Sequence, residues 1–396
     1  MKKLAPEIAR ARNAILIAYI ANGIALGSFL SRIPDYKSIL GITDGRLGLS
    51  LVFGSMGVVI SLGQAGRMSA KFGSKPVIVW STFGVGITIP WIGILTNPWV
   101  LSASLFVWGC TLGFQDISLS SHGVALENES GRKLLSTLHA MYSLGSIIGV
   151  ASGGVFAQLK IVPIIHLGIV GTLLFLITFV IIPLLRPADF DQHVFESRHK
   201  QGRRPQIFWV VGLLGVCAAI SEGTASDWGG VLARDTFGAS PFVSSLPYAL
   251  FCVLMVIGRL NGDRLSERYG TQRILIVGGL IAGTGLTTGM LMNNLAGVFI
   301  GWFFVGIGVS AVIPLLMSLA GEIARERFAG SIAPSEAVAM ITGVSYFAFI
   351  AAPPMLGFLS DHITLRLAIL VPAGLAFAMA IGASFAPIKT KNNLSR

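Results

Sequence analysis

The sequence predicts an all-α membrane protein with about twelve transmembrane helices, arranged as two pseudo-symmetric six-helix bundles. Three observations indicate this fold: an apolar composition, a succession of long apolar runs, and an internal repeat. Of the 396 residues, 53% are hydrophobic and 12% are charged, and the mean hydropathy is +0.76. A soluble domain carries about a quarter charged residues because water hydrates its surface. Most of this surface is therefore expected to face lipid.

The apolar runs give the transmembrane spans in chain order. Each run is close to the roughly 20 residues that a helix needs to cross a hydrocarbon core. Basic residues precede the first run, as in a signal peptide, but the run is long enough to span, so we expect an uncleaved first helix. The expected spans cover residues 13–31, 47–66, 76–95, 99–122, 137–158, 163–185, 207–231, 242–262, 273–292, 295–320, 334–359 and 365–386.

The distribution of Lys and Arg orients these spans. If both termini are cytoplasmic, 23 of the 29 basic residues fall on the cytoplasmic side and six on the outer side. This bias follows the positive-inside rule and predicts a multi-pass protein of the plasma (inner) membrane with both termini in the cytoplasm. It also accounts for the net charge of +11 without a nucleic-acid partner, which a basic chain otherwise suggests.

One long polar connection divides the chain. Residues 186–206 hold five basic residues, three acidic residues and two prolines, and six expected spans lie on each side of them. We therefore expect an N-terminal bundle in residues 1–190, a cytoplasmic linker in residues 191–206 and a C-terminal bundle in residues 207–396.

The two halves also repeat each other in sequence. Residues 66–73 read GRMSAKFG and residues 263–270 read DRLSERYG, at a shift of 197. Both segments lie in the turn after the second expected helix of their half. Duplicated six-helix halves suit a transporter whose halves rock against each other. The identical pairs are Arg67 and Arg264, Ser69 and Ser266, and Gly73 and Gly270.

These turns resemble the signature loop of the major facilitator superfamily, and the six-plus-six layout extends the resemblance over the whole chain. The resemblance implies a secondary transporter that works by alternating access, with its solute bound near midplane between helices 1, 4, 7 and 10. In that family the loop holds neighbouring helices in one conformation. The first copy has Ala70 where the family usually has an acid, whereas the second copy has Glu267 there. The loop residues to which the resemblance assigns this gating role are Arg67, Lys71, Gly73, Asp263, Arg264, Glu267, Arg268 and Gly270.

Finer features resemble a bacterial branch related to the fucose:proton symporter. That resemblance implies a small solute, such as a sugar or a related metabolite, moved together with a proton. The chain departs from the branch at Ser120 and His122, where its members usually carry Asn and Gln. His122 is expected near a solvated helix end. The similar segments are residues 31–37 (SRIPDYK), 222–228 (EGTASDW), 258–264 (GRLNGDR) and 345–357 (SYFAFIAAPPMLG), together with helix 4 and its continuation from Asp116 to His139.

Ionisable groups at membrane depth mark the expected site, because a charge there costs a few kcal/mol unless it faces a cavity or works. Asp116 and Glu222 are the candidate proton carriers, since a protonated carboxyl avoids that cost. A structural acid bonded by neighbouring hydroxyls is the alternative for Asp116, and a polar helix–helix contact is the alternative for Asn22. The expected substrate or proton site comprises Asp116, Glu222, Asn22, Gln115 and Ser120.

An outer gate is expected where the first helices of the two halves end. A shift of 196 brings Arg32 opposite Trp228, next to Asp227. An Arg–carboxylate pair there would be partly shielded from water, and Trp228 would cover it or stack on the guanidinium. In the alternative, Arg32 snorkels to the outer interface and Asp227 is simply solvated.

Other kinds of chemistry leave no pattern in the chain. The sequence contains no phosphate-binding loop and no paired cysteines, so we expect no cofactor, no metal and no ATP-driven transport. Gly145, Gly149 and Gly153 predict close helix packing. We expect a monomer in the lipid bilayer whose partners are a small-molecule substrate and a proton, and no enzyme. The alternatives are an exporter of a drug or cell-made metabolite, and a nontransporting membrane sensor or intramembrane enzyme.

Overall fold

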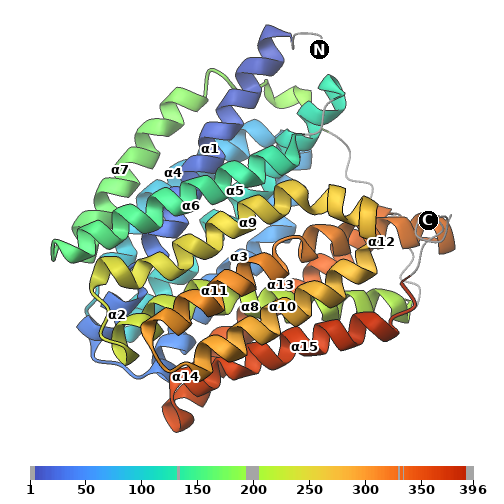
Figure 1. Cartoon of the computed structure of the whole chain (residues 1–396). Helices are drawn as coiled ribbons and strands as arrows, with labels where there is room; N and C mark the ends of the chain where they lie inside the picture. The colour runs from blue at the N-terminus through green and yellow to red at the C-terminus, as the bar shows by residue number, and fades with distance from the viewer. Residues whose placement is uncertain (1–4, 132–133, 193–204, 329–330, 333, 389–396) are drawn as a thin grey trace. The chain divides into compact units, whose positions relative to one another are not determined.

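The computed structural model describes residues 5–131, 134–192, 205–328, 331–332 and 334–388. Within these residues all regular secondary structure is helical. Twelve of the described helical segments are long and apolar enough to cross a membrane, and each overlaps one expected span (Figure 1). The predicted all-α, twelve-helix membrane fold is therefore confirmed.

The chain divides into two compact units. Unit 1 contains residues 1–198 and 240–249, and unit 2 contains residues 199–239 and 250–396. From Pro241 these residues begin a helix, Pro241–Tyr269, that continues in unit 2. Within unit 1 they are held by the Phe242 backbone N–H, which donates to Gln158 Oε1 at 3.3 Å.

Unit 1 is built from helices that pack pairwise along their lengths. α1 packs on α6, α3 on α5, and α4 on both α5 and α7 (Figure 1). Buried Ile15, Tyr19 and Leu119 belong to its core. The elements are α1 (Pro6–Leu30), α2 (Ile33–Leu40), α3 (Asp44–Phe72), α4 (Ser74–Thr88), a 3-10 turn (Ile89–Gly93), α5 (Pro98–Ser130), α6 (Leu135–Gln158), α7 (Pro163–Ile181) and a second 3-10 turn, η2 (Ala188–Phe190).

Unit 2 has the same kind of pairwise packing. α8 packs on α13, and α10 packs on α11 and α15. α11 and α12 form one span, Leu295–Arg327, with an interruption at Ser310 and Ala311. The elements are α8 (Gln206–Val231), a π-helical turn (Leu232–Thr236), α9 (Pro241–Tyr269), α10 (Thr271–Leu291), α11 (Leu295–Val309), α12 (Val312–Arg327), α13 (Pro334–Ile363), α14 (Leu365–Ala368) and α15 (Leu370–Phe385).

Small residues let α1 and α6 touch through their backbones. A Cβ added to Gly23 would lie 2.0 Å from the Tyr142 carbonyl oxygen, and one added to Gly149 would lie 2.3 Å from the Ile24 carbonyl oxygen. Neither distance accommodates a carbon atom. The close helix packing predicted from the glycine spacing is thus present, as expected where helices associate in lipid.

The internal repeat extends to the backbone of the two signature turns. Gly73 and Gly270 each have a φ of +80°, and each directly precedes the next helix, α4 or α10. Residues with a Cβ rarely adopt this conformation. The same glycine therefore makes the same turn in both halves.

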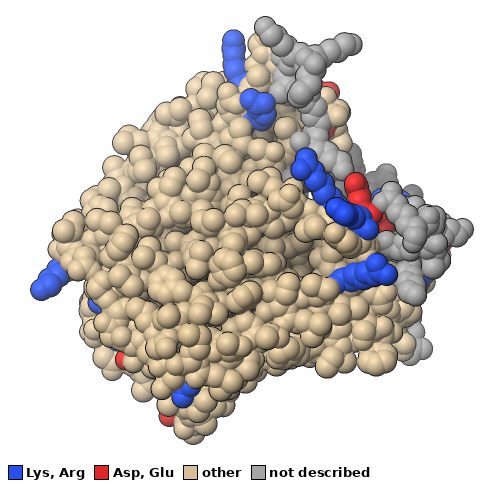
Figure 2. Space-filling model, in the orientation of Figure 1, with Lys and Arg blue, Asp and Glu red and all other residues tan. Residues whose placement is uncertain are grey.

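The surface matches a lipid environment. On the face drawn in Figure 2, charged side chains stand near the edges and the broad middle is free of them. Large apolar side chains such as Trp80 and Leu213 are exposed along the helices. In water such a surface would favour aggregation, whereas in a bilayer it faces acyl chains.

Candidate functional site

Asp116 lies in α5 and is half-buried. Among the described residues, no hydrogen bond or ion pair reaches its carboxylate. The nearby hydroxyl of Ser120 instead lies 2.9 Å from the Tyr19 hydroxyl, which joins α5 to α1. The hydroxyl-bonded structural acid considered as an alternative is therefore not seen in the part of the chain that the structure describes. A charged carboxylate in an apolar span is costly when no cation lies beside it, and protonation removes that cost.

The amides predicted for the site have different surroundings. Gln115 is fully buried, and its Nε2 donates to Thr82 Oγ1 of α4 at 3.0 Å. This bond ties α5 to α4. Asn22 is buried in α1, and no hydrogen bond joins its side chain to a described residue. Asn22 thus has unused hydrogen-bonding groups, whereas the Gln115 donor is engaged in helix packing.

Glu222 has a cationic partner that is not among the expected site residues. Arg259 of α9 lies with its Nη2 3.4 Å from Glu222 Oε1 of α8, and both side chains are about a quarter exposed. The sequence held one available signal, a basic residue inside an expected span. Charged groups inside membranes commonly pair with each other. Glu222 therefore has a cation beside its carboxylate, whereas Asp116 has none among the described residues.

Asp227 and Trp228 lie near the end of α8. The half-buried Asp227 carboxylate accepts a hydrogen bond from the adjacent Ser226 hydroxyl at 2.9 Å. Trp228 is fully buried. The neighbouring turn is held by Trp302, whose indole N–H donates to the Ala225 carbonyl oxygen at 3.1 Å.

Arg32 is held within unit 1. It is 1% exposed, its Nε lies 2.9 Å from Asp35 Oδ2, and its guanidinium donates to the Ile161 carbonyl oxygen. The side chain therefore does not extend to solvent, contrary to the snorkelling alternative. Asp227 belongs to unit 2, so the expected Arg32–Asp227 gate stays a prediction.

The signature loops carry exposed cations. Arg67 and Lys71 have no ion pair with any described residue, and the Lys71 ammonium lies 5.1 Å from the Phe72 ring centroid. In the second loop, Arg268 lies in the same way over Tyr269, at 5.2 Å. The latch roles assigned to both loops, including those of Arg264 and Glu267, stay predictions. The Asp263 side chain lies outside the described residues.

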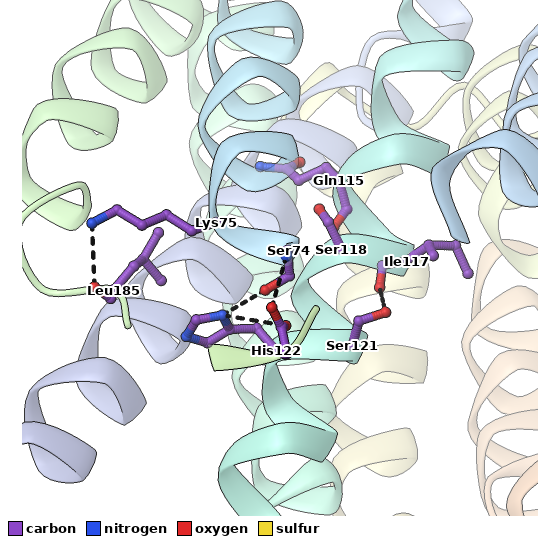
Figure 3. Close-up of polar contacts among 9 residues, drawn as sticks. Ser74, Lys75, Gln115, Ile117, Ser118, Ser121, His122 and Leu185 are labelled. Atoms are coloured by element: carbon purple, nitrogen blue, oxygen red, sulfur yellow. Dashed lines mark hydrogen bonds and ion pairs between the residues drawn. The ribbon is translucent and has the colours of Figure 1, made fainter. Parts of the chain in front are cut away.

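A buried polar cluster lies where α4 begins, as Figure 3 shows. His122 Nδ1 is 2.6 Å from the Ser74 hydroxyl, and Asp191 Oδ1 accepts the Ser74 backbone N–H at 2.9 Å. His122 Nδ1 also lies 3.9 Å from Asp191 Oδ2. His122 is fully buried, so the expectation of a solvated interfacial histidine was wrong. Part of the cover comes from the segment after α7, whose Phe190 ring centroid lies 5.7 Å from that of His122.

Comparisons with known proteins agree with this architecture. A model of the Major Facilitator Superfamily matches residues 15–333 and, in a second match, residues 236–394. An uncharacterized MFS-type transporter of Yersinia pestis is 28% identical over 362 residues, which cover 89% of this chain and 89% of that protein. The solved structure of a bacterial homologue of the human lysosomal transporter Spinster, inward-facing and occupied, has a TM-score of 0.77 at 13% identity and covers 97% of each chain. A structure of the nucleoside transporter NupG has the same TM-score at 11% identity, over 94% of this chain and 99% of that one.

Proposed function

Since this chain belongs to the Major Facilitator Superfamily, we propose that it is a proton-coupled secondary transporter that carries a small polar solute by alternating access. In this proposal Asp116 is the proton carrier. Its carboxylate lies within an apolar span and bonds to no described residue, and this observation carries the proposal. The charged carboxylate costs free energy in an apolar environment, and either protonation or surrounding water reduces that cost. The protonation of Asp116 is therefore linked to the access of water to it.

The solute proposed is rich in hydroxyl groups, such as a sugar or a related metabolite. Asn22 offers a buried amide that bonds to no described residue, and the half-buried Ser120 hydroxyl lies in the same unit, beside Tyr19. Such groups recognise hydroxyls by hydrogen bonding rather than by charge. The resemblance to the fucose:proton symporter branch and the structural likeness to a nucleoside transporter support this class of solute.

We propose the topology that the basic residues predict. Residues 1–190 and 207–396 then form the two bundles, residues 191–206 form a cytoplasmic linker, and the protein is a monomer of the inner membrane with both termini in the cytoplasm. The excess of Lys and Arg on one side supports this orientation.

Transport by the purified protein in proteoliposomes tests the proposal. An imposed pH gradient should drive accumulation of the solute, and Asp116→Asn should abolish accumulation while sparing binding and solute exchange. A thermal-shift screen of sugars and metabolites selects the solute, because a ligand bound only by the folded protein raises its apparent stability. Glu222→Gln is the comparison, because it removes the other candidate carrier.

Each outcome separates the alternatives. Wild-type transport that ignores the pH gradient overturns proton coupling. If Glu222→Gln loses proton coupling and Asp116→Asn keeps it, the proton carrier is Glu222 rather than Asp116. If the solute accumulates only when the proton gradient is directed out of the proteoliposomes, solute and proton move in opposite directions, which indicates the exporter instead.

A further inference from the structure

The segment after α7 lies directly against the end of unit 1 that contains the signature turn. We call residues Leu185–Asp191 the strap. The Lys75 ammonium donates to the Leu185 carbonyl oxygen at 3.4 Å (Figure 3). Gly73 passes so close that an added Cβ would lie 2.0 Å from the Ala188 carbonyl oxygen. The strap therefore packs on the turn that joins α3 to α4.

The strap is fixed at its beginning by an arginine. Arg186 donates to Glu7 of α1 and, at 3.1 Å, to Glu129 near the end of α5. Its guanidinium lies 4.9 Å from the centroid of the Phe190 ring. Exposed ion pairs contribute little singly, but together these contacts join the strap to α1 and α5.

Asp191 is fixed at the other end of the strap. α4 begins after Gly73, which has no side chain with which to cap the helix. The Asp191 carboxylate accepts the Ser74 N–H in its place, and a negative charge is favourable at a helix N-terminus. The Asp191 side chain is only 9% exposed, so solvent screens this contact weakly.

The signature turn of the second half has different hydrogen bonds from that of the first half. There, the Thr271 hydroxyl lies 2.9 Å from the Ser266 hydroxyl, within its own turn. In the first half the equivalent Ser74 hydroxyl contacts His122 instead, and the hydroxyl of Ser69, the equivalent of Ser266, has no partner among the described residues. The first turn is thus tied to α5 and to the strap rather than to itself.

We propose that Asp191 is a positioning residue that supplies the first turn of α4 with the cap that Gly73 lacks. By capping α4 and lying beside His122, it fixes the strap against α4 and α5. α5 also carries Asp116, so the strap sets the cytoplasmic end of the helix that holds the proposed proton carrier. Only this last step rests on the proposed function.

Hydrogen exchange of the full-length protein tests the proposal without any transport assay. Asp191→Ala should make the amides of the strap and of the first turn of α4 exchange about fivefold faster, the factor that follows from losing a helix N-cap. Asp189→Ala is the matched control, because Asp189 has the same charge two residues away and is exposed. No described residue bonds to it, so exchange in this variant should equal that of wild type.

Conservative variants separate capping from general destabilisation. Asp191→Asn keeps an oxygen that accepts the Ser74 N–H but loses the charge, so its exchange should be intermediate. It also keeps the test open if Asp191→Ala fails to fold. In proteoliposomes, Asp191→Ala should lower the turnover of the solute and leave its KM unchanged, whereas Asp189→Ala should change neither.

Two hydrogen-exchange results would overturn the proposal. One is exchange in Asp191→Ala that equals wild type, and the other is an equal rise in Asp189→Ala. If the strap loosens but turnover does not change, Asp191 only caps a helix and the positioning role is wrong. A protein that transports no solute leaves the exchange result intact, so failure of the proposed function is distinguishable.

Discussion

Removing the charge of Glu222 should lower stability, whereas removing that of Asp116 should leave it unchanged or raise it. At 3.4 Å, the Coulomb energy of the Glu222–Arg259 pair is at most about 5 kcal/mol for an effective dielectric constant of about 20. Both side chains are about a quarter exposed, so water reduces that value. Because Glu222→Gln leaves the Arg259 charge without its partner, we expect a loss of about 2 kcal/mol.

The assay is thermal unfolding of the purified protein, followed by tryptophan fluorescence. A loss of about 2 kcal/mol corresponds to a fall of about 4 °C in the apparent melting temperature of a large chain. Asp116→Asn should leave that temperature unchanged or raise it, because it removes a carboxylate that no described residue pairs. The double variant Glu222→Gln/Arg259→Gln should recover at least about 1 kcal/mol relative to the sum of its single variants.

Two outcomes would refute this reasoning. Additive single and double variants would mean that the pair contributes nothing to stability. An equal fall in Asp116→Asn and Glu222→Gln would mean that Asp116 also has a favourable partner in the folded protein.

Two further predictions concern packing and topology. Gly149→Ala should lower the apparent melting temperature, because its Cβ would lie 2.3 Å from a backbone oxygen, whereas Gly168→Ala meets nothing within 4 Å and should be neutral or slightly stabilising; equal effects would contradict the close packing of α1 and α6. In a background without the three native cysteines, a cysteine at Gln192 should react with an impermeant reagent only from the cytoplasm and one at Lys160 only from outside. Labelling of both from one side would remove the proposed topology.

The number and order of the spans were predictable because length and hydropathy alone decide whether a helix crosses a bilayer. The helix ends were not. α5 was expected to end at residue 122 but continues to Ser130, and α12 continues to Arg327 rather than residue 320. The apolar run marks the part of the helix in lipid, whereas backbone hydrogen bonds extend the helix into its charged flank. The π-helical turn Leu232–Thr236 has no local pattern of its own in the sequence.

The cluster around His122 shows why the surroundings of a residue are harder to predict than its place in a span. Ser74 and Asp191 are 117 residues apart in sequence, and no local pattern announces that they meet. His122 was expected near a solvated helix end, which its position in α5 suggested. It is instead an interior residue of α5, which continues to Ser130, and Phe190 and Asp191 of the strap lie against its ring, a placement set by the path of the chain after α7.

The two candidate proton carriers look alike in sequence, since each is an acid inside an apolar run. Their difference lies in a partner: Arg259 stands 37 residues from Glu222, whereas no described residue bonds Asp116. Removing the Glu222 charge would leave Arg259 without its described partner at membrane depth, which is costly. Protonating Asp116 removes a charge that nothing described stabilises. The pairing is therefore the reason we propose Asp116 rather than Glu222 as the proton carrier, a choice that depends on tertiary contacts rather than on residue type.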